Sequence, residues 1–200
     1  MPVNQGRGGP APEPRRTDAR LNRDRLVAAA HEEFAESGPG ASLNRIARRA
    51  GVGPGTLYRH FPDRQALLAA VLADRIARLT AKADLLLATE EPGTALARWL
   101  EALLAHARLH QGMGSALMVE APDGSGADCR RAVVDAARRV LARAQADGLA
   151  RADLDPDDLV RLVAGIALST AHGTDTGQPD RLLALVLDAT TPRPDRPAAR

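Results

Sequence analysis

The sequence has only one cysteine, Cys129, among its 200 residues. A lone thiol cannot form an intramolecular disulfide framework, and it excludes a zinc module built from several cysteines. Long apolar runs are lacking as well, since none approaches the ~18 residues that a membrane span requires. The first residues are rich in Gly, Pro and Arg and lack the apolar segment of a secretory signal. We therefore expect a cytoplasmic protein with no membrane partner.

Aromatic residues are scarce and unevenly placed. Phe34, Tyr58 and Phe61 lie in the first third of the chain, and Trp99 stands alone in the rest. The chain is long enough for one domain or two small ones. The first third can therefore pack around its own aromatic side chains, whereas the rest must form its core from Leu, Val, Ile and Ala.

Charge divides between the same two regions. The net charge is +2, yet residues 1–62 carry ten arginines against six acidic residues, whereas residues 63–200 carry 17 basic and 19 acidic side chains. A basic region beside a mildly acidic remainder indicates that the first region meets a polyanion. Ordinary fluctuation is the alternative, and the charges alone do not decide between the two.

Apolar residues recur at helical spacing from residue 21 onward, and no stretch shows the sustained alternation of a strand. The sequence thus predicts an all-α protein of about nine helices. The expected domains are a flexible basic arm (1–20), a three-helix unit (21–66), a larger helical body (67–190) and a flexible tail (191–200). The predicted helices span about 22–37, 43–50, 54–61, 63–88, 94–110, a short segment ending near 120, 128–147, 156–172 and 179–189.

Two of the short helices are joined by the tight turn Gly51-Val52-Gly53, as in a helix-turn-helix unit. Leu57 and Phe61, four residues apart, are expected to face the core. Such a helix fits the DNA major groove, where its first turn meets base edges. The N-terminal end of this helix, called its leading end below, consists of small residues that let the backbone approach the bases closely: Gly53, Pro54, Gly55 and Thr56. Its outward face offers donors for phosphates and bases: Tyr58, Arg59 and His60.

The stretch Ala50-Gly51-Val52-Gly53-Pro54-Gly55-Thr56-Leu57-Tyr58-Arg59-His60-Phe61 resembles the DNA-binding signature of the TetR/AcrR family of bacterial transcriptional regulators. Ile46-Ala47 before it and Ala66-Leu67-Leu68 after it extend the resemblance over roughly residues 22–72. The resemblance implies an N-terminal helix-turn-helix domain joined by a long fourth helix to a helical effector-binding and dimerisation domain. It further implies a homodimer that binds a pseudo-palindromic operator in double-stranded DNA and represses transcription until a small molecule enters the body.

The resemblance also assigns phosphate contacts. At the start of the second helix they fall on Ser42 with its neighbours Asn44 and Arg45, and at the start of the fourth helix on Arg64. On the recognition helix they fall on Tyr58 and His60, and the base-facing positions fall on Pro54, Gly55 and Thr56, beside the outward Arg59.

Two positions depart from the family pattern. Gly53 stands where a capping Ser is common, and Asp63-Arg64 stands where many members have Ser-Lys. Two of the proposed phosphate contacts have a structural alternative. In it, Tyr58 covers the edge of the small core, and Arg45 lies on a solvent-exposed helix face without contacting DNA.

The body offers little support for catalysis. It has no GxSxG, Walker A or GxGxxG motif, so we expect neither an enzyme nor a cofactor. His106 and His110 have the i, i+4 spacing of metal ligands, but no carboxylate partner follows on that face, so we expect no metal. Cys129 has Arg130 and Arg131 beside it, which would favour a reactive thiolate. An inert, partly buried cysteine is the alternative.

The resemblance implies an effector cavity in the body, and the scarcity of aromatic residues favours a compact or aliphatic ligand of unknown identity. Each candidate lining residue could equally be ordinary core. The candidates are Trp99, Leu103, His106, Met113, Met118, Val133, Ala137, Val163 and Ile166. The expected dimer face lies on the last two helices and comprises Val160, Val163, Ala167, Leu182, Leu185 and Val186. The competing function is a DNA-binding dimer without small-molecule control, or one with a redox response through Cys129.

Overall fold

The computed structural model describes residues 14–38, 40–110 and 125–192, and all the regular secondary structure within these ranges is α-helix. The all-α prediction is therefore confirmed. The predicted short helix ending near residue 120 lies outside the described residues, as do Met113 and Met118. The helices are α1 (Pro14–Ser37), α2 (Leu43–Arg49), α3 (Pro54–His60), α4 (Arg64–Thr89), α5 (Pro92–His110), α7 (Ser125–Ala146), α8 (Pro156–Ser169) and α9 (Gln178–Thr190).

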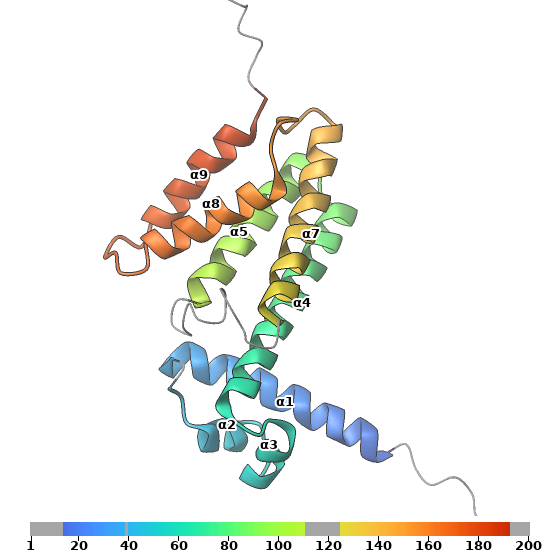
Figure 1. Cartoon of the computed structure of the whole chain (residues 1–200), viewed down its shortest axis with the longest axis vertical. Helices are drawn as coiled ribbons and strands as arrows, with labels where there is room; N and C mark the ends of the chain where they lie inside the picture. The colour runs from blue at the N-terminus through green and yellow to red at the C-terminus, as the bar shows by residue number, and fades with distance from the viewer. Residues whose placement is uncertain (1–13, 39, 111–124, 193–200) are drawn as a thin grey trace, which may run out of the picture. The chain divides into compact units, whose positions relative to one another are not determined.

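The chain divides into two compact units, Met1–Leu67 and Leu68–Arg200. In the first unit α1, α2 and α3 pack on one another (Figure 1). Apolar side chains at helical spacing on each of them fill the space between. Of the three aromatic residues predicted to hold this unit together, Phe34 and Phe61 are buried, whereas Tyr58 is exposed. Its fully or nearly fully buried residues include Leu26, Ala30, Phe34, Ile46, Leu57 and Phe61.

The first helix begins earlier than the sequence predicted. It starts at Pro14 rather than near Asn22, so residues 14–20 are helical and do not belong to a flexible arm. Proline suits the first turn of a helix, because its φ is already helical and its missing N–H would have no partner there. The prediction failed because the apolar periodicity begins only after residue 20, and solvent-exposed helical turns carry no such signal.

The turn between α2 and α3 depends on Gly51. Its φ is +69°, a left-handed conformation that costs any residue with a Cβ free energy. Two hydrogen bonds close the end of α2: Gly51 N donates to Arg48 O at 3.1 Å and Val52 N donates to Ala47 O at 3.0 Å. This is the Schellman arrangement, and it sets the direction in which the chain enters α3.

Replacing Gly51 by alanine is therefore expected to lower the free energy of unfolding by about 1 kcal/mol. Gly40 provides the control, because it is exposed, its φ is not left-handed and an added Cβ would meet nothing within 4 Å. Urea unfolding of both variants should show a loss for Gly51→Ala alone. Equal stabilities would mean that the turn tolerates a side chain.

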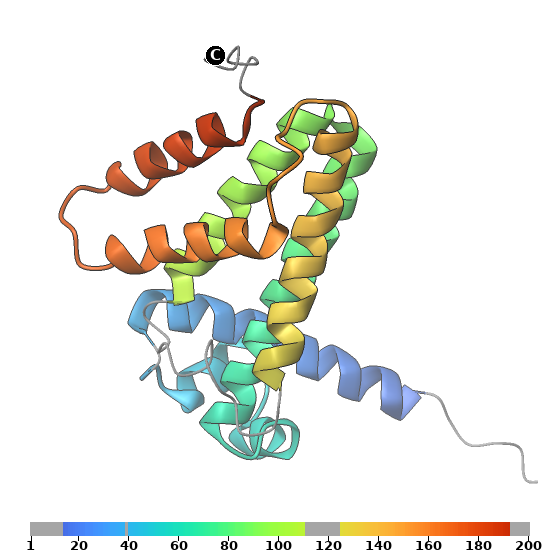
Figure 2. The same ribbon diagram turned by 45° about the horizontal axis from the view of Figure 1, so that its top comes forward.

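In the second unit α5 packs against α7, α8 and α9, while α8 and α9 lie side by side (Figures 1 and 2). As predicted, Leu, Val and Ala from these helices and from α4 form most of the core, with Trp99 at its centre. Asp155 caps α8 by accepting a hydrogen bond from Asp157 N at 2.7 Å, and the helix ends at Ser169, three residues before the predicted end. No helix in the described ranges is long and apolar enough to cross a membrane.

Candidate nucleic-acid interface and cavity

The leading end of α3 is exposed, while the side chains that hold the helix in place are buried. Pro54 and Gly55 are open to solvent, and Thr56 is half-buried. Leu57 and Phe61 lie in the core of the first unit, as their spacing predicted. The structure thus brings the small residues proposed to face bases to one accessible end of a firmly packed helix.

Of the three outward donors on α3, two are open to solvent. Tyr58 is 50% exposed, which argues against a role in covering the core. Arg59 is also exposed, but it folds back along the helix. Its Nε donates to Gly55 O and its Nη2 donates to Thr56 Oγ1, both at 3.2 Å. His60 is half-buried. Arg59 therefore lies against Gly55 and Thr56, two of the three residues expected to meet bases.

Arg45 and Arg49 on α2 pair with acidic residues of α1. Arg45 Nη2 lies 2.9 Å from Glu33 Oε2, and Arg49 Nε lies 3.3 Å from Glu33 Oε1. The Glu33 side chain is only 3% exposed. Arg49 also donates hydrogen bonds to Glu36 at 2.9 and 3.1 Å, which hold the pKa of that carboxyl below its usual value. These pairs join α1 to α2, a role that sequence inspection missed.

A second stripe of α2 carries polar residues away from these pairs. Asn44 and Arg48, four residues apart, are exposed, and among the described residues neither takes part in the ion pairs with α1. Ser42 occupies the N-cap position of α2, as predicted, yet its hydroxyl makes no capping hydrogen bond. Ser42 is exposed, so its hydroxyl is accessible to a ligand.

Arg64 begins α4 and is tied to the start of α2. Its Nη1 donates to the carbonyl oxygen of Ala41 at 2.5 Å. Asp63 caps the same helix end, accepting from Ala66 N at 2.8 Å. The Asp63-Arg64 pair that departs from the family pattern therefore has structural contacts within the first unit, and part of the Arg64 side chain remains exposed.

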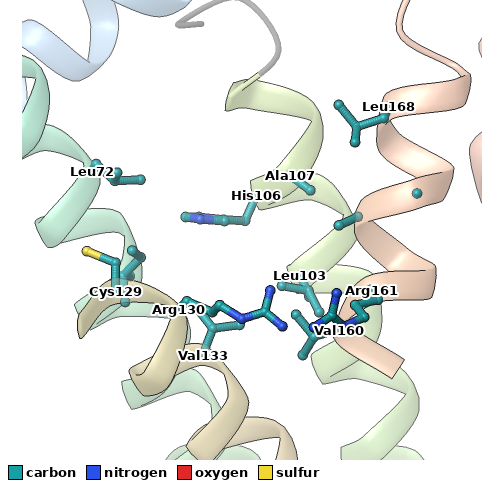
Figure 3. A pocket seen from close by; sticks show the side chains of 13 residues that line it. Leu72, Leu103, His106, Ala107, Cys129, Arg130, Val133, Val160, Arg161 and Leu168 are labelled. Carbon is teal, nitrogen blue, oxygen red and sulfur yellow. The ribbon is translucent and has the colours of Figure 1, made fainter. Parts of the chain in front are cut away.

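The second unit contains a cavity of about 220 Å³ between α4, α5, α7 and α8 (Figure 3). Of the predicted lining residues, Leu103, His106 and Val133 do line it. Its wall is otherwise formed by residues that the sequence did not single out as lining. These are Leu72, Ile76, Ala107, Cys129, Arg130, Val160, Arg161, Ala164, Gly165 and Leu168.

Four predicted lining residues lie elsewhere. Trp99, Ala137 and Val163 are buried in the packed core and do not reach the cavity. Ile166 borders a shallower hollow on α8 instead. The side chain of His110 lies outside the part of the chain whose side chains are described. Helical periodicity identifies inward-facing residues, but it does not tell which of them border empty space.

Two arginines stand in the cavity wall and share one carboxylate. Arg130 Nη2 donates to Asp157 Oδ1, and Arg161 Nε donates to Asp157 Oδ2 at 2.6 Å. The hydrogen bond from Arg161, supported by the charge of Arg130 and opposed by burial, holds the pKa of the Asp157 carboxyl below its usual value. The carboxyl is therefore ionised at neutral pH. The sequence feature that could have revealed this cluster is the i, i+4 spacing of Asp157 and Arg161, which is typical of an ion pair on a helix.

The predicted dimer-face residues divide into buried and accessible ones. Val160, Val163 and Ala167 are buried within the protomer, so they cannot present a face to a partner, and Val160 lines the cavity. Leu182 and Val186 are half-buried, whereas Leu185 is exposed. Leu162 and Leu168 on α8 are also largely exposed, although the sequence analysis did not select them.

Comparison with known proteins bears on both units. Residues 26–71 match the family model for bacterial regulatory proteins of the tetR family, and residues 91–190 match the C-terminal domain of SbtR-like transcriptional regulators. A TetR transcriptional regulator of Streptomyces coelicolor is 40% identical, with a TM-score of 0.74 over 85% of this chain and 98% of that one. The chain belongs to the TetR family.

Two further similar proteins are also regulators of transcription. A TetR transcription regulatory protein of Mycobacterium vanbaalenii is 34% identical, with a TM-score of 0.69 over 89% of this chain and 99% of that one. An HTH-type transcriptional regulator of Staphylococcus aureus is 51% identical over 53 residues, which make up 26% of this chain and 29% of the relative. The match to that relative thus spans under a third of its length. As a TetR-family transcriptional regulator, the chain carries its DNA-binding domain at the N-terminal end.

Proposed function

We propose that this protein is a repressor that binds a pseudo-palindromic operator as a homodimer and leaves the DNA when a small molecule enters the cavity of the second unit. The exposed, small-residue leading end of α3 carries this proposal. The apolar cavity with two arginines in its wall supports ligand control. A function on chromosomal DNA agrees with the expected cytoplasmic location and requires no catalysis.

The proposed DNA contacts follow from what is exposed on the first unit. The first turn of α3 enters the major groove, where Pro54 and Gly55 let the backbone approach and Thr56 meets a base. Ser42 and Asn44 on α2 and Tyr58 on α3 meet phosphates, which position the helix. Arg48 joins them, because it shares the accessible stripe of Asn44. Arg45 contributes less than the sequence suggested, since it pairs with the buried Glu33.

The test uses the full-length protein and a pool of random DNA duplexes, because the operator is unknown. Repeated selection should enrich two inverted half-sites whose centres are ~34–36 Å apart or a multiple of one helical turn. Affinity for the selected duplex should fall steeply with salt, because bound phosphates release counterions. Enrichment of a single half-site, or of no sequence at all, would refute operator binding by a dimer.

Replacing Gly55 by alanine is expected to weaken operator binding about tenfold, on the order of one good base contact, without destabilising the fold. An added Cβ at Gly55 meets no atom of the protein within 4 Å, so only the approach to DNA is obstructed. Fluorescence anisotropy with the selected duplex measures the loss, and thermal unfolding checks the fold.

Gly93 supplies a matched control, because Pro92-Gly93-Thr94 repeats the Pro54-Gly55-Thr56 sequence at the start of α5 in the other unit. A Cβ there would make only ordinary contact with Leu149, at 3.7 Å. Gly93→Ala should bind DNA like the wild type. If both variants or neither lose affinity, the leading end of α3 does not approach the bases.

The second candidate mechanism is a thiol response through Cys129, which the cavity wall exposes to any reactive molecule that enters. Cys129→Ser separates the two mechanisms. A thiol sensor would lose its release from DNA by mild oxidants, whereas a reversible ligand would release both proteins equally.

A further inference from the structure

All the charged side chains that line the cavity, among the described residues, are basic. Arg130 on α7 and Arg161 on α8 line it, and no acidic side chain does. In Figure 3 the two guanidinium groups extend toward each other between the helices. Their side chains are 45% and 64% exposed, so they stand at the mouth of the cavity rather than in its depth.

Asp157 orients both arginines but does not balance their charge. Each guanidinium donates one hydrogen bond to Asp157, and each retains further N–H groups. Two cations against one carboxylate leave one positive charge at the mouth. Asp158 acts on Arg161 as well, through its charge alone, and therefore offsets the remaining positive charge only in part. An added anion that accepts hydrogen bonds from the remaining N–H groups would offset the rest.

The rest of the wall is almost wholly aliphatic. Among the described residues, no Phe, Tyr or Trp lines the cavity, so the imidazole of His106 is the one ring on which a planar ligand could stack. His106 is the remaining titratable group of the wall besides Cys129, and Figure 3 places it on the side of Leu72 and Cys129, away from the arginines. The apolar contacts come from Leu72, Ile76, Leu103, Val133, Val160 and Leu168.

We propose that the cavity binds an aliphatic monocarboxylate, with its carboxylate held by Arg130 and Arg161 at the mouth and its chain among the aliphatic side chains inside. Guanidinium groups match the planar, two-oxygen geometry of a carboxylate. The small volume suits a single unbranched chain better than a bulky molecule. This ligand class rests on the proposed function only for its effect on DNA, and its binding is testable without DNA.

The test compares three eight-carbon probes that differ only in their head group: octanoate, 1-octanol and octylamine. Octanoate is ionised at neutral pH, as aspartate is, and should raise the melting temperature most. Octanol keeps the apolar contacts but leaves the positive charge unbalanced, so its shift should be smaller. Octylamine adds a like charge and should give no shift. Equal shifts for octanol and octanoate would overturn the role of the arginines.

Variants then locate the carboxylate. Arg130→Gln and Arg161→Gln should each weaken octanoate binding tenfold or more in calorimetric titration, with octanol binding unchanged. Arg139→Gln is the matched control, because Arg139 lies on the same helix and also pairs with an aspartate of another helix, Asp84, at 2.9 Å. It does not line the cavity. Equal octanoate affinity in Arg130→Gln and Arg139→Gln would refute the proposed contact.

The same probes distinguish failure of the ligand class from failure of the proposed function. Octanoate that binds with these differences but does not release the selected duplex supports the cavity assignment and refutes ligand-controlled repression by this class. Octanoate that fails to bind overturns the ligand class, even where another compound releases the DNA and the proposed function survives.

Discussion

An arginine in place of Leu185 on α9 is expected to turn the proposed dimer into a monomer. Leu185 is 64% exposed in the isolated protomer, so the substitution leaves the core of the second unit intact. In a dimer that packs through α8 and α9, however, the new guanidinium would be buried without a partner, which is strongly unfavourable. Sedimentation at micromolar concentration should then give a mass near 21.1 kDa instead of twice that value.

DNA binding should fall with the dimer. A monomer engages one half-site, whereas a dimer engages two with the second binding event made intramolecular, so affinity for a two-half-site duplex should drop by about a hundredfold. Affinity for an isolated half-site should not change. This difference separates loss of the dimer from damage to the first unit.

Leu85→Arg serves as the control, because Leu85 is similarly exposed, at 61%, but lies on α4. Leu162→Arg on α8 provides a second probe of the face in case Leu185→Arg unfolds. A dimer that survives both α8 and α9 substitutions would place the interface elsewhere. The pair Leu182 and Val186, suggested by the sequence, is less suitable, since both are half-buried within the protomer.

Most of the fold was predictable because local sequence patterns, such as apolar spacing and turn residues, determine where the helices lie and which faces they bury. The four-residue spacing of Leu57 and Phe61 predicted which face of α3 is buried, and the glycine turn and Pro54 predicted where this helix begins. The predicted and observed ends of α3 therefore agree to within a few residues. The start of α1 was missed, because its first turns lack an apolar face. The pairing of Glu33 with Arg45 was missed for another reason: it joins residues of two helices, and no local signal states which faces meet.

The cavity lining was also only partly predictable, because it depends on how several helices pack together. Leu103 and Val133, which the sequence proposed as lining, border it, but Val163 and Ala137 face inward with equal periodicity and lie in packed core. Whether an inward side chain borders empty space depends on the volumes of residues from four helices together. Arg130 and Arg161 were overlooked as lining, since charged residues on a helix are usually solvated.

Trp99 provides the clearest test of the distinction between a packed core residue and a residue that borders the cavity. Its replacement by alanine is expected to lower the free energy of unfolding by about 3–5 kcal/mol. Its side chain is fully buried, and Nε1 donates to the carbonyl oxygen of Leu79 at 3.1 Å. That loss is a large share of the stability of a domain, and chemical unfolding would show it directly.

Trp99→Phe separates the contribution of packing from that of the hydrogen bond. Leu79 lies inside α4, so its carbonyl also accepts from the following turn and is not left without a donor. Phenylalanine keeps most of the buried ring, and its cost should be about 1–2 kcal/mol. Because Trp99 does not border the cavity, Trp99→Phe should bind octanoate like the wild type. A stable Trp99→Phe protein with altered octanoate affinity would instead return this residue to the cavity wall, where the sequence first suggested it.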